Sequence, residues 1–245
     1  MNKIALAAIA LCSLIKSPDS NADTLVLTSL EWPPYTSQYL SDHGASSAVV
    51  KAALQAMGHD LEIRFYPWSR AVRLAKNNKD YAGYFPEYHL ESDDLLLSDS
   101  IGSSTLGFVE RVKDPIKWST LSDLKPYSIG VVQDYVNTKE LDEKIANGML
   151  RASPVLNDAS NIRKLGAERI SIAVIDEYVF QYLMENDPKL DLLNGELQMN
   201  AKRLENKELF IAFTNDDLGR KWRKIINQGL KKIKVNQIAT QSLNQ

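Results

Sequence analysis

The feature that most constrains the fold is an alternation of strand-like and helix-like segments along the chain. The segments of the first half are a β-branched apolar strand, a helical apolar stripe, an alternating strand, a short helix and a further strand, at residues 24–29, 45–57, 61–66, 67–76 and 81–85. This order is typical of a mostly parallel sheet that helices cover.

The same alternation begins again in the second half. Strands and helices are predicted in turn at residues 128–133, 139–146, 170–175, 177–186, 208–214 and 217–232. The strand at 170–175 is apolar throughout, as expected of a strand that is buried on both faces. Two α/β units without a flexible tether predict two lobes, and residues 106–112 and 202–210 are candidate strands that cross between them.

The first residues predict export. Lys3 is followed by an apolar run at residues 4–15 and by the small residues Ser20 and Ala22, which is the arrangement of a secretory signal peptide over residues 1–22. The run is shorter than the roughly 20 apolar residues that a membrane-spanning helix needs. An uncleaved anchor and a buried N-terminal helix are the alternatives. We therefore expect a periplasmic protein.

Cysteine and histidine usage argues against a metal or cofactor site. Cys12 is the only cysteine and lies inside the predicted signal peptide, where Leu11 replaces the small residue that a lipoprotein signal needs. The exported chain then has no thiol for catalysis or metal binding. His43, His59 and His89 are isolated, and no glycine-rich phosphate loop occurs. We expect neither a metal nor a cofactor.

Charge and composition limit the classes of partner that the chain can bind. The chain has 29 basic and 31 acidic residues, so it has no basic excess that would bind nucleic acid or an anionic membrane. Hydrophobic residues make up 44% of its 245 positions, enough for one large or two modest cores. Ser103 and Ser104 lack the Gly-x-Ser-x-Gly turn of a nucleophilic serine. We therefore expect no enzyme. Ser103 is a candidate ligand contact.

Several short motifs, each weak alone, occur in an order that resembles the family 3 extracellular solute-binding proteins, which include polar amino-acid binding proteins of transport systems. The motifs that carry the resemblance are Trp32-Pro33-Pro34-Tyr35, Ala56-Met57-Gly58-His59, Asn78-Lys79-Asp80, Leu97-Ser98-Asp99-Ser100, Leu121-Ser122-Asp123-Leu124, Ile129-Gly130-Val131-Val132-Gln133 and residues 169–176. The resemblance covers nearly the whole chain after residue 22.

The resemblance implies an α/β protein with two lobes, each a mostly parallel sheet flanked by helices, hinged by crossing strands (the type II periplasmic binding fold). Lobe one would comprise residues 23–109 and 204–245, and lobe two residues 110–203. The ligand would bind in the cleft, at the carboxyl ends of the strands, where open α/β sheets place ligands. The resemblance further implies a monomer that binds a small molecule and serves a membrane permease.

Two aromatic residues are candidates for the wall of the cleft. Trp32 and Tyr35 lie on a loop that Pro33 and Pro34 stiffen, after the first strand. Rings presented there can cover an apolar or cationic face of a ligand. The alternative is that one ring fills the core of its lobe. In the resembled family the aromatic residue after the prolines lines the pocket, which favours Tyr35.

Asp176 is the sharpest single assignment. It ends an apolar strand, where a carboxylate is costly unless it is solvated, paired or exposed at the edge of the cleft. In the resembled family, the final Asp of this segment receives the ammonium group of the ligand. The alternative is that Asp176 caps the helix that follows, and both roles are compatible.

Two departures from the family argue against an ordinary α-amino acid as ligand. Amino-acid binders carry an Arg that forks onto the α-carboxylate, and Glu91 stands at that position here. Their loop of backbone amides contains a Gly-Thr pair, which is Asp134-Tyr135 here. If Glu91 and Asp134 both face the cleft, the pocket is acidic and favours an amine-bearing solute.

A helix after the second strand offers a replacement for the missing Arg. Arg70 is a candidate ligand contact from this direction, with Trp68 as a stacking wall. The alternative is that Arg70 lies on a solvated helix face, as most helix-surface charges do. Tyr84, at the end of the third predicted strand, is a further candidate.

These observations predict a periplasmic protein that captures a small polar, amine-bearing solute and performs no chemistry. One alternative is an enzyme on the same scaffold, similar to the periplasmic dehydratases of cyclohexadienyl substrates, with Asp134, Glu91 and Asp176 as acid and base candidates. The other is a ligand-sensing module that partners a membrane sensor.

Overall fold

The computed structural model describes residues 22–243, so the predicted signal peptide lies outside the described residues apart from Ala22. The strands of the described part are β1 (Thr24–Ser29), β2 (Asp60–Phe65), β3 (Gly83–Glu87), β4 (Leu95–Leu97), β5 (Gly102–Arg111), β6 (Ser128–Val132), β7 (Arg151–Val155), β8 (Ile172–Asp176), β9 (Leu197–Met199) and β10 (Glu205–Thr214). They form one curled sheet with the main strand order β2-β1-β3-β10-β5-β8-β6-β7.

The helices pack around this sheet. They are α1 (Ala45–Gln55), α2 (Trp68–Asn77), α3 (Lys139–Ala146), α4 (Asp158–Gly166), α5 (Glu177–Asn186), α6 (Asp217–Leu230) and α7 (Val235–Leu243), with 3-10 turns at Ser41–His43, Leu121–Leu124 and Pro188–Leu193. Among residues 22–243, no helix combines the length and the apolar character that crossing a membrane requires. The sequence pattern missed α4, α7, β4, β7 and β9, all of which are short.

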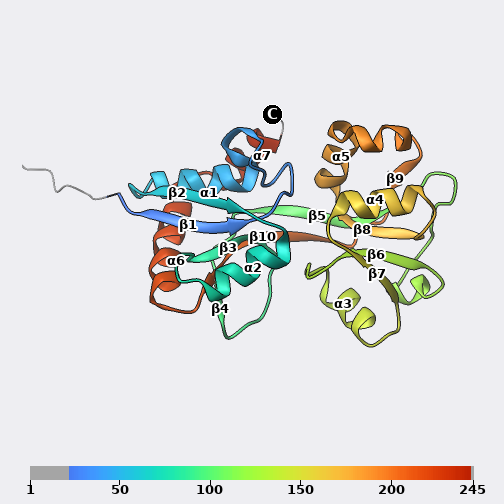
Figure 1. Cartoon of the computed structure of the whole chain (residues 1–245), viewed down its shortest axis with the longest axis horizontal. Helices are drawn as coiled ribbons and strands as arrows, with labels where there is room; N and C mark the ends of the chain where they lie inside the picture. The colour runs from blue at the N-terminus through green and yellow to red at the C-terminus, as the bar shows by residue number, and fades with distance from the viewer. Residues whose placement is uncertain (1–21, 244–245) are drawn as a thin grey trace, which may run out of the picture.

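Two groups of parallel strands define two lobes. In lobe one, β1 pairs in parallel with β2 and β3, and in lobe two, β6 pairs in parallel with β7 and β8. Figure 1 shows the two groups at opposite ends of the molecule, with α1, α2 and α6 around the first and α3, α4 and α5 around the second. The two-lobed α/β architecture expected from the sequence is confirmed.

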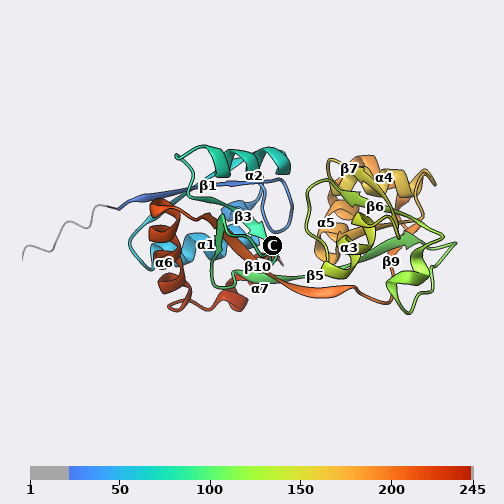
Figure 2. The same ribbon diagram turned by 90° about the horizontal axis from the view of Figure 1, so that it is seen from below.

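The strands β5 and β10 join the lobes, as Figure 2 shows. β10 pairs with β3 and β4 in lobe one and with β5 between the lobes, and β5 continues into lobe two beside β8 and β9. The sequence pattern placed the crossing strands at residues 106–112 and 202–210, a few residues away from their observed bounds. The predicted lobe borders stay predictions: the first falls inside β5, and the second lies just before β10.

Side-chain caps begin the helices that follow the strands of lobe two. Thr138 accepts a hydrogen bond from the Leu141 N–H at the start of α3. Asp176 accepts one from the Val179 N–H at 3.0 Å, which confirms its expected role as the N-cap of α5. Asn157 caps α4 in the same way, so the first residue of α4, Asp158, is held at the carboxyl end of β7.

The apolar core shows that the lobes touch. The larger cluster of buried side chains includes Leu27 and Trp222 of lobe one together with Ile162 of α4 and Val179 of α5 in lobe two. A smaller cluster around Phe108 belongs to lobe two. Because one cluster draws on both lobes, the structure is closed, and residues on the facing edges of the two lobes meet.

Candidate functional site

The functional candidates gather where strand ends of the two lobes face each other. Trp32 and Tyr35 lie in the loop after β1, held by a hydrogen bond from the Trp32 N–H to the Thr36 carbonyl oxygen at 2.7 Å. Tyr88 follows the end of β3, and Asp176 ends β8 on the opposite lobe. The carboxyl ends of the strands thus supply the site, as in other open α/β sheets.

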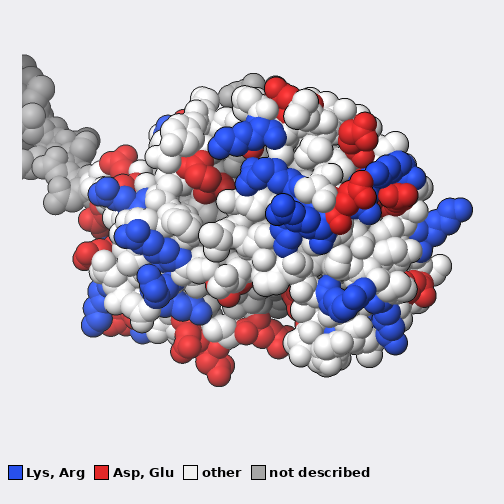
Figure 3. All heavy atoms as spheres, turned by 45° about the vertical axis from the view of Figure 1, so that its right-hand side comes forward, with Lys and Arg blue, Asp and Glu red and all other residues white. Residues whose placement is uncertain are grey.

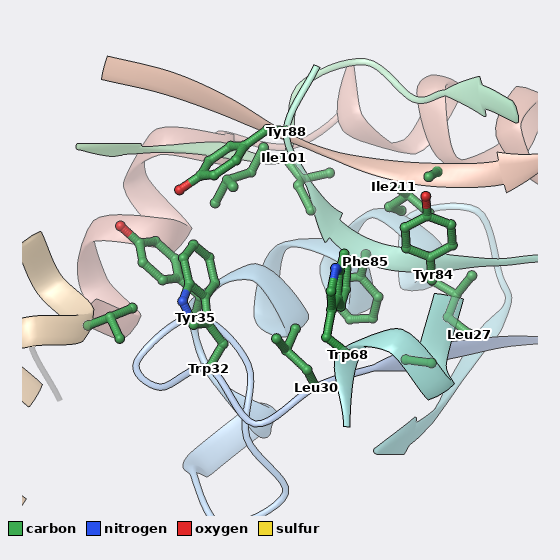
Figure 4. Close-up of a cluster of buried hydrophobic side chains, with 14 of the residues drawn as sticks. Leu27, Leu30, Trp32, Tyr35, Trp68, Tyr84, Phe85, Tyr88, Ile101 and Ile211 are labelled. Atoms are coloured by element: carbon green, nitrogen blue, oxygen red, sulfur yellow. The ribbon is translucent and has the colours of Figure 1, made fainter. Parts of the chain in front are cut away.

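Aromatic rings form one side of this site. Trp32 stacks on Tyr35 with ring centroids 4.5 Å apart, and Tyr88 meets the edge of Trp32 at 6.3 Å. The Tyr88 hydroxyl and the Ser104 hydroxyl lie 2.6 Å apart. Figure 4 shows the hydroxyl groups of Tyr35 and Tyr88 pointing away from the core around Leu27. Both hydroxyls are therefore available to polar groups between the lobes.

Asp176 is buried, with 2% of its surface exposed. The Tyr35 hydroxyl donates a hydrogen bond to its Oδ2 atom at 3.2 Å, across the cleft, while its Oδ1 atom caps α5. Burial raises the pKa of Asp176 from 3.8 to about 6, against the opposite effect of the hydrogen bonds. The loss of hydration therefore raises the pKa of Asp176 by more than the surrounding hydrogen-bond donors lower it.

Asp158 is a second buried carboxyl on lobe two. Burial, and then the negative charge of Asp176, raise its pKa from 3.8 to about 7, while hydrogen-bond donors on Tyr135 and Trp32 act in the opposite direction. The two aspartates repel each other at neutral pH when both are ionised. A cation between them would relieve this repulsion.

Glu87, on lobe one, is the third buried carboxyl that lines the hollows. It ends β3, and its Oε1 atom accepts a hydrogen bond from the Tyr88 N–H at 2.8 Å. Burial raises its pKa from 4.5 to about 7, although hydrogen bonds and Lys207 lower it. Tyr84 lies beside it, and burial together with the Glu87 charge raises the pKa of the Tyr84 hydroxyl.

Lys207 of β10 is the one basic side chain found among the buried polar residues of the described chain. Its ammonium group lies 4.5 Å from the centroid of the Tyr88 ring and donates a hydrogen bond to the Asn137 carbonyl oxygen on lobe two. Burial lowers its pKa. Within residues 22–243, no ion pair within 4.0 Å involves Lys207, Glu87, Asp158 or Asp176.

Two adjoining hollows open between the lobes. The first measures ≈ 310 Å³, including solvent at its mouth, and its walls are Leu30, Trp32, Trp68, Pro86, Glu87, Tyr88, Tyr135, Val136 and Leu209. The second measures ≈ 280 Å³, again including open solvent, and is lined by Trp32, Tyr88, Leu106, Val132, Tyr135, Val136, Asn137, Asp158, Val174, Ile175 and Asp176. Four residues line both, so the hollows adjoin each other, with Glu87 on the first and Asp158 and Asp176 on the second.

Direct contacts hold the lobes together beside the hollows. The Trp68 indole N–H donates to the Asp134 carbonyl oxygen at 3.0 Å, and the Ser69 hydroxyl donates to the Asp134 carboxylate at 2.5 Å. The Trp68 ring also meets the edges of the Tyr84 and Tyr135 rings. Asp134 is therefore an exposed contact between the lobes and does not line either hollow.

Of the residues predicted from the sequence, five meet at the site: Trp32, Tyr35, Trp68, Tyr135 and Asp176 line the hollows or join them by a hydrogen bond. Tyr84 lies behind Trp68, in contact with its ring. These five residues lie at or just after strand ends, which fixes the edge of the sheet that each one occupies.

Three predicted contacts lie elsewhere. Arg70 is exposed and rests over the Tyr66 ring at 4.9 Å, so it does not replace the missing Arg. Glu91 is exposed and lines an outer groove with His89 and Lys139, because the chain after β3 turns outward. Ser103 is exposed on β5, where alternation turns its neighbour inward.

The structure adds five residues that the sequence pattern did not single out: Glu87, Tyr88, Ser104, Asp158 and Lys207. No group of three or more His, Cys, Asp or Glu side chains in the described chain is placed to hold a metal ion. On the face shown in Figure 3, acidic and basic side chains are interspersed.

No protein-family model and no curated protein matches the sequence. Solved structures resemble it at low identity. A histidine kinase sensor domain with similarity to periplasmic binding proteins has a TM-score of 0.71 at 17% identity, over 85% of this chain and 89% of that chain. An ancestral arginine-binding protein bound to arginine has a TM-score of 0.72 at 14% identity, over 90% and 96%.

A third example is the GluR0 ligand-binding core from Nostoc punctiforme in complex with L-glutamate, with a TM-score of 0.69 at 16% identity over 89% of this chain and 96% of that chain. The three matches cover 85–90% of this chain. The chain therefore has the two-lobed α/β fold of the periplasmic-binding-protein-like structures.

Proposed function

We propose that this protein is an exported receptor that closes its two lobes on a small, amine-bearing solute. The observation that carries the proposal is the set of three buried carboxyls without an ion-pair partner, Glu87, Asp158 and Asp176, around an aromatic hollow. Buried charges in proteins are normally paired, and a cation is the partner that fits here. The stacked rings of Trp32 and Tyr35 add faces that attract a cation.

The site offers little to an anionic group. Arg70 lies outside it, and the ammonium of Lys207 is engaged by the Asn137 carbonyl oxygen and the Tyr88 ring. A ligand carboxylate in the hollow would face Glu87 instead of a guanidinium. The neighbours bound to arginine and glutamate support capture of a small molecule between lobes. They do not carry over their ligands, because the acidic lining here favours a ligand without a carboxylate.

Binding is favoured over catalysis. The enzyme alternative requires Asp134, Glu91 and Asp176 to act on one substrate. Asp134 is hydrogen-bonded to Ser69 at the rim, and Glu91 lies in the outer groove. Of these three residues, only Asp176 lines one of the two hollows. Formation of product from a cyclohexadienyl acid would support the enzyme alternative.

A thermal-shift screen tests the receptor proposal. The purified protein is mixed with panels of amines, amino acids and organic acids, and the hits are measured by calorimetry. A ligand that binds only the folded state raises its stability by about 2.7 kcal/mol at a hundred times its dissociation constant. We expect shifts with amines and none with organic acids. Shifts confined to acids, or no shift in the whole panel, would contradict the proposal.

Trp68→Phe is expected to speed release of a bound amine about fivefold. The change removes the indole N–H that bridges the lobes to the Asp134 carbonyl oxygen, a hydrogen bond worth about 1 kcal/mol net, and keeps most of the ring. Stopped-flow measurement of the dissociation rate, with the amine that gives the largest thermal shift, provides the readout.

Trp118→Phe is the matched control, because the Trp118 indole N–H donates to Asn200 within lobe two. This variant should release the amine at the rate of the unchanged protein. Equal rates for both variants would mean that the bridge from Trp68 does not hold the lobes closed.

We also propose that the protein is exported and acts with a membrane protein. The signal-like residues 1–22 and the fold support export. A permease and a membrane sensor are the two partner classes, and the sensor-domain neighbour shows that this fold also serves signalling. Binding of the closed protein to a co-encoded permease or sensor, measured with and without the amine, would identify the partner.

A further inference from the structure

The site has an acidic end in each lobe, with an apolar middle. Asp158 and Asp176 line one hollow on lobe two, and Glu87 lines the other on lobe one. Resting on the proposed function, we infer that the ligand is a dication with a short aliphatic chain, an α,ω-diamine whose two ammonium groups reach the two ends.

The end in lobe two is built to hold an ammonium group. Asp176 and Asp158 are 2% and 6% exposed, and each lies next to a hydrogen-bond donor from a ring, Tyr35 for Asp176 and Tyr135 for Asp158. A carboxylate accepts about four hydrogen bonds. Asp158 has room for a further donor, whereas Asp176 already accepts hydrogen bonds from Tyr35, Ser104 and two backbone N–H groups, so a ligand ammonium would act on Asp176 through its charge. One ammonium has three donors and would neutralise the repulsion between the two aspartates.

The end in lobe one repeats this arrangement with a single carboxyl. Glu87 is 6% exposed, and one of its oxygens accepts the Tyr88 N–H. Lys207 does not pair with it: the Lys207 ammonium points to the Asn137 carbonyl oxygen and the face of the Tyr88 ring. A ligand with one ammonium, bound in lobe two, would leave Glu87 buried without an ion-pair partner within 4.0 Å, with only the more distant charges of Lys207 and Lys76 to offset it. A second ammonium would supply it.

The middle of the site suits a methylene chain. The residues common to both hollows are Trp32, Tyr88, Tyr135 and Val136, which offer ring faces and an aliphatic group. Apolar surface of this kind gains about 0.8 kcal/mol for each methylene group it covers. Ring faces also attract the cationic ends of the chain. A zwitterion of similar length would place its carboxylate beside Glu87, which repels it.

The test compares three probes of one length by titration calorimetry: 1,4-diaminobutane, n-butylamine and 4-aminobutanoate. We expect the diamine to bind at least tenfold more tightly than the monoamine, and the zwitterion to bind more weakly than the diamine. Diamines with three and five methylene groups, measured in the same way, would report the spacing of the two ends.

Glu87→Gln locates the second ammonium. The change should lower the affinity for 1,4-diaminobutane about tenfold or more and leave the affinity for n-butylamine within twofold, because only the diamine reaches Glu87. Glu91→Gln, in the exposed outer groove, is the matched control and should leave both affinities unchanged. Circular dichroism checks that each variant is folded. If Glu87→Gln does not fold, the three probes on the unchanged protein decide.

Two results would overturn the inference. Equal affinity for the monoamine and the diamine would mean that the site holds one cation, and the proposed amine receptor would stand without the diamine. If 4-aminobutanoate binds more tightly than 1,4-diaminobutane, the end of the site in lobe one binds an anionic group. Absence of binding by every amine in the wider screen would overturn both this inference and the proposed function.

Discussion

Asp176→Asn is expected to lower the affinity for an amine ligand at least thirtyfold while it raises the stability of the ligand-free protein. Removing one partner of a buried, hydrogen-bonded charge pair costs about 2–5 kcal/mol of binding free energy, and 1.4 kcal/mol corresponds to a factor of ten. Asn keeps an oxygen that can accept the Val179 N–H, so the cap of α5 is retained.

The gain in stability follows from the raised pKa of Asp176. Because burial raises this pKa from 3.8 to about 6, the ionised carboxylate is less stable in the folded protein than in the unfolded chain at neutral pH. A neutral side chain of the same shape removes that cost, which is on the order of 1–3 kcal/mol. Urea denaturation at pH about 7.5 measures it, and calorimetry measures the affinity.

Asp216→Asn is the matched control for this substitution. Asp216 caps α6 through the Gly219 N–H at 2.9 Å, the same local role that Asp176 has in α5, but it lies away from the hollows. The control should leave amine affinity unchanged and should not raise stability, because the pKa of Asp216 is lowered by its cap. Unaltered binding by Asp176→Asn would remove this carboxylate from the ligand site.

Asp176→Asn is thus expected to weaken amine binding and to raise the stability of the ligand-free protein. Both effects arise because the buried carboxylate destabilises the folded protein as long as no ligand is bound. Functional sites often conflict with local rules of stability, and the conflict is visible here in carboxyls buried without ion-pair partners. The sequence pattern predicts the parts of the molecule that follow the local rules of stability and misses residues that conflict with them. Apolar periodicity predicts the two lobes and the main helices, and the position of strand ends predicts the aromatic loop after β1. At these places the residues that stabilise the fold are also the ones that produce the sequence pattern.

Asp158 was missed because it breaks the pattern that marks a helix. The buried side of α4 is made of Asp158, Asn161, Ile162 and Leu165. Their spacing is that of a helical stripe, but two of the four are polar, so an apolar stripe does not stand out. The cap residue Asn157, three residues before Ser160, was the remaining signal for a helix start.

Glu87 and Lys207 were missed for reasons of strand geometry. The predicted third strand ended at residue 85, whereas β3 continues through Pro86 to Glu87 and carries Glu87 to the cleft. Lys207 lies at the point where β10 crosses between the lobes, and which face of a crossing strand turns inward depends on its pairing with β5. The same dependence turns Ser104 inward and leaves Ser103, the candidate from the sequence, exposed.

Glu91 illustrates the limit of a resemblance. Its position was counted from the Ser98-Asp99 motif, and that count assumes that the loop between β3 and β4 follows the family path. In this protein the loop turns outward, and Glu91 lies exposed beside His89 and Lys139. The acidic character that Glu91 predicted is present, but Glu87 and Asp158 supply it.

The stability of the ligand-free protein is expected to fall by a few kcal/mol as the pH rises from about 4.5 to about 8. The cause is the raised pKa of three carboxyls: about 7 for Glu87, about 7 for Asp158 and about 6 for Asp176. In this range the folded protein binds more protons than the unfolded chain. The stabilisation is complete below the unfolded pKa values of 3.8 and 4.5, and it is lost as the pH rises through the folded values.

Other charged groups act on this profile, but weakly. Lys207 faces the cluster from β10, and burial lowers its pKa, so it changes charge well above the window. Asp23, Asp123 and Glu168 have lowered pKa values and contribute the opposite slope, but they are exposed and act mainly below the window. The falling slope between about pH 5 and 8 therefore belongs to the three buried carboxyls.

Urea denaturation at a series of pH values measures the slope, and a double variant assigns it. Glu87→Gln combined with Asp158→Asn removes two of the three titrating groups and should flatten the profile while raising the stability at about pH 8. Glu91→Gln and Asp216→Asn together remove two carboxyls away from the hollows, and this control should keep the falling slope. A ligand-free protein whose stability is constant or rises over this range would mean that the cluster is not buried as the closed structure has it, and that the lobes stand apart until a cation brings them together.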